Sequence, residues 1–366
     1  MKKIPFLDLS KVHSEIQNVI DKSVFKVLNS GSYILGKELS EFENTYSEFE
    51  NVKHAVGVGS GLDALLLIIK ALNINAGDEI IVPSHTFIAT WLAISKAGAT
   101  PVPVEPDQDT YNINPNLIES AITKKTKAIV VVNLYGQIVD LDPIRRICNK
   151  NNLYLIEDAA QSHGALYKNI HTGSISDAIA TSFYPGKNLG CMGDGGAVLT
   201  NNDEIALNVR RLRNYGSLKK YEHIDIGFNS RLDEIQASIL NIKIKELNIL
   251  NKKRRKIADF YNENLSSKNI IIPKKLSYCD HVWHLYVIRS KNRDKLMQKL
   301  FEAGIQTIIH YPIPPHLQKC YDYLKLDNMK LTEKICSEIL SLPLYPNMPK
   351  DDIYYITEMV NKFSNN

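Results

Sequence analysis

The sequence predicts an α/β protein with a mainly parallel sheet flanked by helices, followed by a smaller C-terminal α+β domain. Two observations lead to this prediction. Short β-rich runs alternate with helical stretches through the first half of the chain, and a long, charged, amphipathic segment follows them. Strands that alternate with helices favour a parallel sheet covered on both faces. The length of 366 residues also exceeds that of one typical domain.

Six runs are expected to form the strands of this sheet, at residues 79–82, 101–104, 128–132, 153–156, 178–183 and 197–200. The N-terminal segment through Glu50 begins extended and becomes helical. Residues 233–261 have the pattern of a helix that links two domains, with a boundary near Lys252. The prediction is a large domain over residues 1–251 and a small domain over 252–366, the latter with strands at 284–288 and 305–309.

Composition and charge exclude several classes of protein. The net charge is only +4, and Lys and Glu are interspersed without a long basic run, which argues against a nucleic-acid partner. No apolar stretch approaches the roughly 18 residues that a membrane helix needs. The N-terminus lacks the apolar core of a signal peptide. We therefore expect a cytoplasmic protein with no membrane contact.

The cysteines and histidines show neither a disulfide framework nor a metal pattern. Ten histidines lack metal-ligand spacing, and five cysteines are scattered and odd in number. We expect reduced thiols and no metal. Cys191 lies close after Lys187, but a small apolar filler is the expected role there rather than a catalytic thiol. The five positions are Cys148, Cys191, Cys279, Cys320 and Cys336.

Lys187 is the first candidate for chemistry. It lies in a Gly/Pro-flanked turn directly after an apolar run, in the segment Ser182-Phe183-Tyr184-Pro185-Gly186-Lys187-Asn188-Leu189-Gly190. An ammonium just beyond a strand end can be partly desolvated, which lowers its pKa and makes the nucleophilic amine accessible. Lys187 is therefore a candidate Schiff-base lysine. The alternative is a solvated loop lysine, one of 44 Lys and Arg residues.

Asp158 is the second candidate, because it ends the buried run 153–156 at the start of Glu157-Asp158-Ala159-Ala160-Gln161-Ser162-His163-Gly164. Ligands of open α/β sheets lie beyond the carboxyl ends of the strands, so Asp158 should face the same crevice as Lys187. Pyridoxal phosphate (PLP) needs both a lysine for its aldehyde and an Asp for its pyridinium nitrogen. Taken alone, Asp158 could equally be a helix N-cap.

A third segment, Gly57-Val58-Gly59-Ser60-Gly61-Leu62-Asp63-Ala64-Leu65, opens a helix-forming stretch. Small residues let backbone N–H groups approach a phosphate, and the positive end of the helix dipole favours its charge. The spacing does not match the dinucleotide pattern, and the Gly-Lys-Ser/Thr ending of a P-loop is absent. A single phosphate is therefore the expected ligand.

With these three segments, the chain resembles the DegT/DnrJ/EryC1/StrS family of PLP-dependent aminotransferases that act on nucleotide-linked keto-sugars. The resemblance runs nearly end to end and implies a fold-type I transferase whose N-terminal segment packs with the large domain. It also rests on Phe6-Leu7-Asp8-Leu9, Gly31-Ser32-Tyr33-Ile34-Leu35-Gly36, Pro83-Ser84-His85-Thr86-Phe87, Leu134-Tyr135-Gly136-Gln137, Gly193-Asp194-Gly195-Gly196 and Gly227-Phe228-Asn229-Ser230-Arg231.

The resemblance implies roles for individual residues around the cofactor. Lys187 bonds to the PLP aldehyde, Asp158 pairs with the pyridine nitrogen, and Gln161 contacts the ring hydroxyl. Phe87 stacks on the ring, although an ordinary core phenylalanine is the alternative. The phosphate is held at the start of the helix by Ser60, Gly61, Leu62 and Ser182, and by Asn229 from a neighbouring subunit, which implies a homodimer with a shared active site.

Three positions differ from common family patterns. Leu62 stands where Thr is frequent, so one side-chain hydrogen bond to the phosphate is expected to be missing. Asn133 replaces a common His, and Asp194 replaces a common Glu. Some members carry His at the lysine position and act as dehydratases, whereas Lys187 is typical of the transaminating branch.

The segment His310-Tyr311-Pro312-Ile313-Pro314-Pro315-His316 is a proline-rich loop that resembles a substrate-facing segment of the family. Phenols and imidazoles can donate directional hydrogen bonds to sugar hydroxyls or to a diphosphate. The candidates for substrate contact are Tyr184, His310, Tyr311 and His316. Each could instead belong to a surface loop whose shape is fixed by proline.

The implied reaction is a transamination in two half-reactions with L-glutamate as the amino donor and pyridoxamine 5'-phosphate as the intermediate form of the cofactor. Residues 59–65, 88–94 and 310–316 look most like members that aminate dTDP-3-keto-6-deoxyhexoses for surface polysaccharides or natural products. Amination at C4 is the alternative, and the gluco or galacto configuration stays open. A PLP-binding regulator, a structural scaffold and an amino-acid aminotransferase that uses Arg231 are less favoured.

Overall fold

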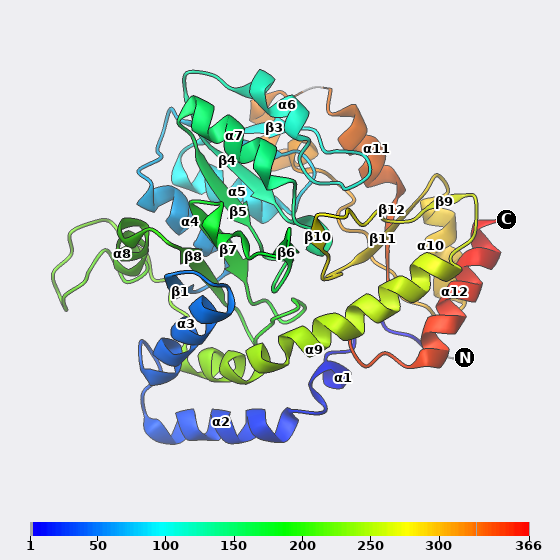
Figure 1. Cartoon of the computed structure of the whole chain (residues 1–366), viewed down its shortest axis with the longest axis horizontal. Helices are drawn as coiled ribbons and strands as arrows, with labels where there is room; N and C mark the ends of the chain where they lie inside the picture. Colours follow the sequence, from blue (N-terminus) through cyan, green and yellow to red (C-terminus); the bar gives the residue numbers. More distant parts are fainter. Residues whose placement is uncertain (1–2, 327, 366) are drawn as a thin grey trace.

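The computed structural model describes residues 3–326 and 328–365. Its centre is a seven-stranded sheet in the order β1-β8-β7-β5-β4-β2-β3 (Figure 1). Strands β7, β5, β4, β2 and β3 are parallel to one another, whereas β8 is antiparallel to both β1 and β7. The strands are β1 (His54–Val58), β2 (Glu79–Pro83), β3 (Thr100–Val104), β4 (Thr126–Val132), β5 (Tyr154–Asp158), β7 (Ala178–Ser182) and β8 (Gly196–Thr200).

The α/β fold with a mainly parallel sheet is therefore confirmed, and so are all six strands predicted for it. The prediction missed β1, because its glycine was assigned to the phosphate-binding turn. Yet β1 is a buried strand paired along its whole length with β8. Its one glycine, Gly57, lies against the Leu39 and Leu232 side chains, where a larger residue would clash.

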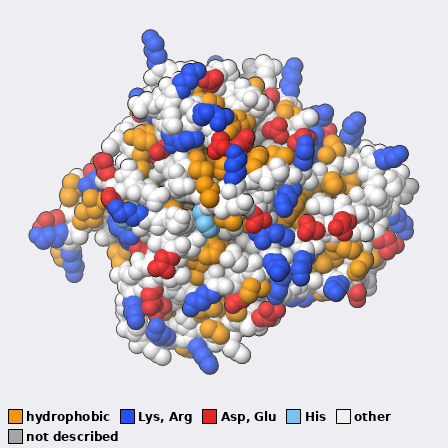
Figure 2. Space-filling view, viewed as in Figure 1, with side chains coloured by type: hydrophobic (Ala, Val, Ile, Leu, Met, Phe, Trp, Pro, Cys, Tyr) orange, Lys and Arg blue, Asp and Glu red, His pale blue; other side chains and the backbone are white. Residues whose placement is uncertain are grey.

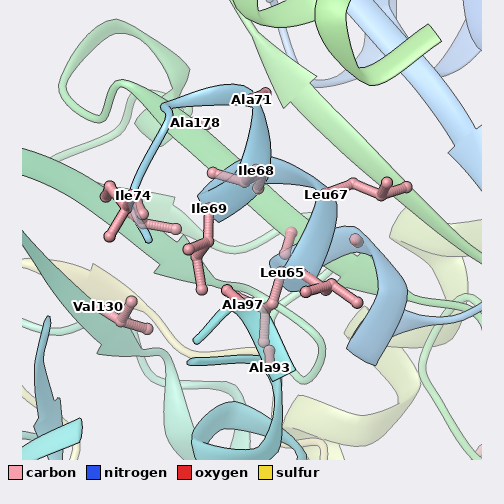
Figure 3. Close-up of a cluster of buried hydrophobic side chains, with 14 of the residues drawn as sticks. Leu65, Leu67, Ile68, Ile69, Ala71, Ile74, Ala93, Ala97, Val130 and Ala178 are labelled. Atoms are coloured by element: carbon pink, nitrogen blue, oxygen red, sulfur yellow. The ribbon is translucent and has the colours of Figure 1, made fainter. Parts of the chain in front are cut away.

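Helices cover both faces of the sheet, as the alternating pattern predicts. On one face, alternate apolar residues of the strands pack against α4 (Gly61–Ala71), α5 (Ile88–Ala97) and α8 (Asp203–Leu212). Figure 3 shows part of this core, with Leu65 and Ile69 of α4, Ala97 of α5, Val130 of β4 and Ala178 of β7. The opposite face packs against α3 (Lys37–Phe49), α7 (Leu141–Asn151) and the first half of α9 (Glu234–Asn264).

Helix α9 matches the predicted linking helix of residues 233–261. Asp233 is its N-cap and accepts a 2.8 Å hydrogen bond from the Gln236 amide, which fixes the start of the helix. Residues up to Leu247 pack in the core under the large sheet, whereas Ile257 and Tyr261 pack in the C-terminal core. The helix thus runs from one core to the other, obliquely across the lower half of the molecule and above α2 in Figure 1. The division at residue 252 stays a prediction.

The C-terminal part contains a three-stranded antiparallel sheet in the order β12-β11-β9. The predicted strand 284–288 corresponds to β11 (Tyr286–Ser290). The prediction of a strand at 305–309 is wrong: Ile305 bridges to Ile4 and Ile308 bridges to Ser341, so the segment pairs at two single points and forms no ladder. The remaining elements are α10 (Arg293–Glu302), α11 (Lys330–Glu338), α12 (Lys350–Ser364), β9 (Ile270–Ile271) and β12 (Ile339–Leu342).

The N-terminal segment divides its contacts between the two cores. It begins with α1 (Leu9–His13) and α2 (Gln17–Ser30), and α2 and α3 pack along α9. The first residues behave differently, since Ile4 is buried in the C-terminal core and its backbone bonds to Gly304 and Gln306. The expectation that the whole segment packs with the large domain is therefore wrong for its extended start. The short elements not yet mentioned are α6 (Pro115–Ile118), β6 (Leu166–Tyr167) and β10 (Cys279–Asp280).

Two sequence expectations concern features of the whole chain. Among the described residues, no helix combines the length and apolar character needed to cross a membrane. The same part of the chain contains no cluster of three potential metal-ligating side chains. All five cysteines are free thiols, and four of them are buried. Cys191 packs in the core with its sulfur 3.0 Å from the Phe183 and Gly193 carbonyl oxygens, and burial raises its pKa to about 11.

Candidate active site

The residues singled out in the sequence meet at the carboxyl-terminal edge of the sheet. Asp158 is the last residue of β5, opposite Val132 of β4 and Ala180 of β7 in the ladder. Ser182 ends β7, and the turn that carries Lys187 follows it. Because these strands are parallel and adjacent, their ends deliver the side chains to one crevice. The sheet order thus explains why segments far apart in the sequence form one site.

The Asp158 carboxylate is buried and held from two sides. Thr90 Oγ1 donates to one carboxylate oxygen at 2.9 Å, and the Ala160 amide donates to the other at 3.2 Å. Burial raises the pKa of Asp158, while these two hydrogen bonds and the charge of Lys187 lower it. A positively charged ligand group placed against the carboxylate would strengthen its ionised form. The alternative role as a helix N-cap does not apply, because no helix begins after Asp158.

Lys187 lies close enough to Asp158 for the two charges to interact. Burial of its ammonium lowers the pKa from 10.5 to about 8, against the opposing effect of the Asp158 carboxylate. At pH 7 about a tenth of the Lys187 amine is therefore neutral, which is the form that acts as a nucleophile. The alternative of a solvated loop lysine does not fit this half-buried position.

The turn that carries Lys187 is fixed by polar contacts from α9. Asn188 Nδ2 donates to Asn251 Oδ1 at 2.9 Å and to the Val282 carbonyl at 3.0 Å. Lys243, two turns before Asn251, donates to the Gly190 carbonyl from a buried position. The α9 helix therefore determines where the Lys187 backbone lies. The sequence reasoning assigned neither contact.

The start of α4 is where the sequence predicts a phosphate cradle, and it leaves two backbone amides without partners in the described part of the chain. Ser60 is its N-cap, and its side chain and carbonyl occupy the amides of Asp63 and Ala64. The amides of Gly61 and Leu62 form no hydrogen bond within residues 3–326 and 328–365, and they point out of the positive end of the helix. A side chain at Gly61 would lie 2.6 Å from Cβ of Ser182, so the cradle and the end of β7 are in close contact.

Gln161 and Phe87 both contact Tyr311, which lies close to Asp158. The Tyr135 amide donates to Gln161 Oε1 at 2.7 Å, and Gln161 Nε2 donates to the Tyr311 hydroxyl at 3.1 Å. The Phe87 ring is 49 % exposed, with its centroid 5.2 Å from that of Tyr311. Phe87 is therefore not an ordinary core phenylalanine, and its open face is available for stacking.

The proline-rich loop contributes some of its predicted residues and not others. His310 is half-buried near Lys187; burial and that charge lower its pKa to about 4, and its Nδ1 lies 2.8 Å from Ser341 Oγ. Tyr184 is 60 % exposed beside the Lys187 turn. His316 lies apart from this group: its imidazole is buried, and Nε2 contacts Glu333 of α11 at 3.2 Å. This geometry favours a structural role for His316.

Asn229 follows the long excursion between α8 and α9. Its backbone bridges to Asn214, and its side chain is exposed, with no hydrogen bond to the rest of the described chain. Arg231, the candidate carboxylate binder of an amino-acid aminotransferase, instead donates to Asn214 Oδ1 at 3.0 Å and lies over the Tyr215 ring. These contacts give Arg231 a structural role in this segment.

Two residues in contact with the site were missed in the sequence. Thr90 lies one helical turn after Phe87, so the two share a face of α5, and this i, i+3 spacing is a signal that could have been used. Tyr135 belongs to the Leu-Tyr-Gly-Gln segment, which was recognised without a role. Asn133, a departure from the family pattern, donates to Glu157 Oε2 at 2.8 Å and supports the strand end from below.

The groups in this crevice fit PLP. Lys187 supplies an amine for an aldehyde, Asp158 supplies a carboxylate for a protonated ring nitrogen, and the two unpaired amides of α4 match a phosphate. Beside Asp158, Tyr311 brings together an aromatic ring and an amide side chain, as a flat heterocycle with a hydroxyl substituent requires. The fold and this arrangement together define a PLP-dependent transferase.

Comparison with known proteins narrows this class. The chain matches the profile of the DegT/DnrJ/EryC1/StrS aminotransferase family over residues 14–361, and it belongs to that family. It is 50% identical over 360 residues to a dTDP-3-amino-3,6-dideoxy-alpha-D-galactopyranose transaminase of Aneurinibacillus thermoaerophilus, covering 98% of this chain and 99% of the relative. The chain is thus an aminotransferase, and its cofactor is pyridoxal phosphate.

Solved structures agree with this assignment over the full length. A crystal structure of S. venezuelae DesV in complex with a ketimine intermediate superposes with a TM-score of 0.98 at 43% identity and covers 100% of both chains. NtdA from Bacillus subtilis, crystallised with the bound cofactor PMP, gives a TM-score of 0.94 at 34% identity and covers 100% of this chain and 86% of its own.

Proposed function

We propose that this enzyme transfers the amino group of L-glutamate to C3 of a dTDP-3-keto-6-deoxyhexose and so makes a dTDP-3-amino-3,6-dideoxyhexose. The observation that supports it most is the 50% identity, over nearly the whole of both chains, to a transaminase with this type of product. Lys187 and Asp158, which lie together at one sheet edge, are consistent with that chemistry. The product would serve surface polysaccharide or natural-product synthesis in the cytoplasm, where free thiols persist.

The residues of the chain divide the work of each half-reaction. When bound, PLP holds the amino group between the two half-reactions and accepts electrons from the carbon that loses a proton. Lys187, whose lowered pKa leaves part of its amine neutral, would take up that proton and give it back. Asp158, fixed by Thr90 and Ala160, keeps the ring nitrogen protonated. Overall, the keto-sugar gains an amine and L-glutamate leaves as its 2-keto acid.

We further propose that the sugar nucleotide is held by Tyr184, His310 and Tyr311. The exposed Tyr184 ring and the phenol of Tyr311 flank the Lys187 turn and the Gln161 side chain. Burial raises the pKa of Tyr311, so its hydroxyl stays protonated and can donate to a sugar oxygen. The imidazole of His316 is buried against Glu333, so it is not among the proposed contacts with the sugar nucleotide.

The active site is proposed to be shared in a homodimer. The segment between α8 and α9 projects from the body at the left of Figure 1, and apolar side chains are visible on it in Figure 2. Tyr221 is 83 % exposed, Ile224 68 % and Ile226 97 %. Such apolar exposure on an extended segment is typical of a surface covered by a partner. Asn229, at the base of this segment, would reach the phosphate of the second copy.

The test of the reaction follows the absorbance of the purified enzyme in two steps. Addition of L-glutamate should remove the visible band of the lysine-bound cofactor, and a dTDP-3-keto-6-deoxy-sugar should restore it. Mass spectrometry should then find a new amine on the sugar nucleotide, and NMR should locate it at C3. Lys187→Ala is the control and should show neither change.

Three results would contradict the proposal. An amine at C4 would replace it with the alternative regiochemistry. A yellow protein unchanged by glutamate would overturn the donor, and a coloured protein unchanged by any donor or sugar would favour a PLP-binding regulator. Parallel assays with gluco- and galacto-configured sugars would identify the preferred configuration.

The shared site has its own test, which uses two inactive variants. Lys187→Ala lacks the amine, and Asn229→Ala should lack the phosphate contact from the partner. When the two proteins are unfolded together and refolded, mixed dimers should regain activity, because one of their two sites then has both residues intact. If the mixture stays inactive while each variant is dimeric, Asn229 does not act across the interface.

A further inference from the structure

Three hydrogen bonds connect α11 to the loop that carries His310. They pass through two residues that follow strands of the large sheet. Cys336 of α11 lies with its sulfur 3.5 Å from His85 Nδ1, and His85 Nε2 lies 3.0 Å from the Tyr135 hydroxyl. The Tyr135 hydroxyl in turn donates to the backbone carbonyl of His310. Tyr135, His85 and Cys336 are all buried, with at most 4 % of each exposed. None of the three has a role in the reaction described above.

The donor and the acceptor in each of these three hydrogen bonds follow from the number of hydrogens available. The Tyr135 hydroxyl has one hydrogen, and the His310 carbonyl can only accept it. Therefore Tyr135 Oη must accept from His85 Nε2–H. A neutral imidazole then has Nδ1 free to accept from the Cys336 thiol. Burial lowers the pKa of His85 to about 4 and raises that of Cys336 to about 12, so both groups have the required protonation at neutral pH.

Tyr135 also orients Gln161, which is a hydrogen-bond partner of Tyr311. Its backbone amide donates to Gln161 Oε1 at 2.7 Å, which forces the amino group of that side chain toward the Tyr311 hydroxyl at 3.1 Å. Tyr135 has φ of 60°, a left-handed conformation that is rare for a bulky residue. In this conformation its amide faces Gln161 while its ring reaches the His310 carbonyl. One residue thus contacts both the cofactor side and the loop side of the crevice.

We propose that Tyr135 is a positioning residue that holds the His310–Tyr311 segment against Gln161, and that Cys336 and His85 orient its hydroxyl for this task. Ring contacts with Phe6 and Phe87 hold the side chains of His310 and Tyr311. The backbone is held at Ile308 by Ser341 and at Ile313 by Gln318. Between these two points, the Tyr135 hydroxyl makes the one hydrogen bond to the backbone from the described part of the chain. Loss of the Tyr135 hydroxyl should therefore loosen the segment that faces the sugar. The sugar part of this inference rests on the proposed function.

The test compares Tyr135→Phe with Tyr111→Phe in the holoenzyme. Tyr111 is a matched control, because its buried ring packs edge-on against Tyr135 at 6.0 Å while its hydroxyl interacts with Arg289. For Tyr135→Phe we expect the KM for the keto-sugar to rise about three- to tenfold, as for one lost buried hydrogen bond. The half-reaction with L-glutamate should change less than about twofold. Cys336→Ala should show the same pattern more weakly.

A second measurement does not depend on the identity of the substrate. Hydrogen exchange of the holoenzyme without substrate should speed up over residues 308–316 in Tyr135→Phe and stay unchanged in Tyr111→Phe. Unchanged exchange in that segment, or equal losses in both half-reactions, would overturn the positioning role. Failure of the native enzyme to accept the keto-sugar would contradict only the proposed function, because the exchange experiment would still test the hydrogen bond.

Discussion

Thr90 Oγ1 lies 2.9 Å from Asp158 Oδ2, so the first turn of α5 supplies a hydrogen bond donor to the carboxylate at the end of β5. The Thr90 hydroxyl is itself 2.9 Å from the hydroxyl of Thr86. Because the Ala160 amide holds the other carboxylate oxygen, the plane of the carboxylate is fixed. Asp158 therefore meets a ring nitrogen in a prepared orientation, and the ionised form is favoured in a buried place that would otherwise disfavour it.

Thr90→Val should weaken cofactor binding through Asp158. The substitution keeps the shape of the side chain but removes the donor, so the pKa of Asp158 should rise further and its pairing with a protonated ring should weaken. A hydrogen bond to a charged group is worth about 1.5–3 kcal/mol, which corresponds to a roughly ten- to hundredfold higher Kd for PLP. Fluorescence titration of the apo-protein measures this. Thr90→Ser retains the hydroxyl and should restore most of the affinity; equal losses in both variants would assign Thr90 a packing role.

Gly61→Ala should weaken the binding of the phosphate of PLP and leave the binding of its ring unchanged. A Cβ at this position would lie 2.6 Å from Cβ of Ser182, so the start of α4 or the end of β7 must shift. The shift would displace the two unpaired amides of the cradle, and overpacking of this kind costs about 1–3 kcal/mol. The Kd for PLP should rise about tenfold or more, whereas pyridoxal, which lacks the phosphate, should bind as it does to the native protein. A parallel loss of pyridoxal binding would contradict a specific effect on the cradle.

Six of the seven strands of the large sheet, and the proximity of Lys187 to Asp158, could be predicted because each depends on a short, local signal. Apolar runs that end in polar residues gave the strands, and a helix start rich in small residues gave the cradle at Gly61. Lys187 and Asp158 could be placed together because parallel strands deliver their ends to the same edge. No such local signal distinguishes the antiparallel β8 from its parallel neighbours.

Contacts between distant segments could not be read from the sequence. His316 and His310 have similar surroundings in the chain, but only the folded protein shows His316 buried against Glu333 and His310 near Lys187. Likewise, the run at 305–309 has the composition of a strand, yet it pairs with Ile4 and Ser341 through only one isolated bridge each. The burial of His316 and the missing strand at 305–309 both depend on which surfaces meet after folding, and the composition of a short segment does not predict those contacts.

The reactivity of Lys187 should depend on pH with a midpoint near 8. Burial lowers the pKa of its ammonium from 10.5 to about 8, so the neutral amine becomes the main form above that pH. The rate at which the apo-protein bonds to the PLP aldehyde should therefore rise through pH 8 and level off well below 10. Stopped-flow absorbance measures this rate. Lys187→Ala should form no covalent product, and a midpoint near 10 would show that the amine is solvated.

The Asp158 carboxylate raises the pKa of Lys187 through its charge. Asp158→Asn removes that charge, so the midpoint of the same rate profile should move to lower pH. The direction of the shift separates this electrostatic effect from a general loosening of the site. A looser site would admit water and move the midpoint upward, toward the ordinary value for a lysine.

Alkaline pH should destabilise the apo-protein through its buried thiols. Burial raises their pKa from 9.0, so above pH 9 the unfolded chain loses thiol protons that the folded chain keeps. Because the folded state then binds more protons, the free energy of unfolding falls as pH rises, by up to about 1.4 kcal/mol per pH unit for each thiol. The pKa is about 11 for Cys191 and about 12 for Cys148, Cys279 and Cys336.

Lys187 and Lys243 oppose this trend, because their pKa values in the folded state are lowered to about 8. Between pH 8 and 10 the unfolded chain binds the protons that these amines have lost, which stabilises the folded state as pH rises. Averaged between pH 9 and 10, four thiols against two lysines leave a net fall of roughly 1.5 kcal/mol. The buried tyrosines whose pKa is raised from 10.0 to about 12 add to that fall. Urea unfolding under reducing conditions at pH 8, 9 and 10 measures it.

Two cysteine variants separate the thiols from other causes of alkaline unfolding. Cys148→Ala removes one buried thiol in α7, and its stability should decline with pH less steeply than that of the native protein, by about one thiol's share. Cys320→Ser is the control, because it changes the exposed thiol and removes no buried one; it should leave the slope unaltered. If both variants keep the native slope, or if stability rises above pH 9, the buried thiols are not what limits this protein at high pH.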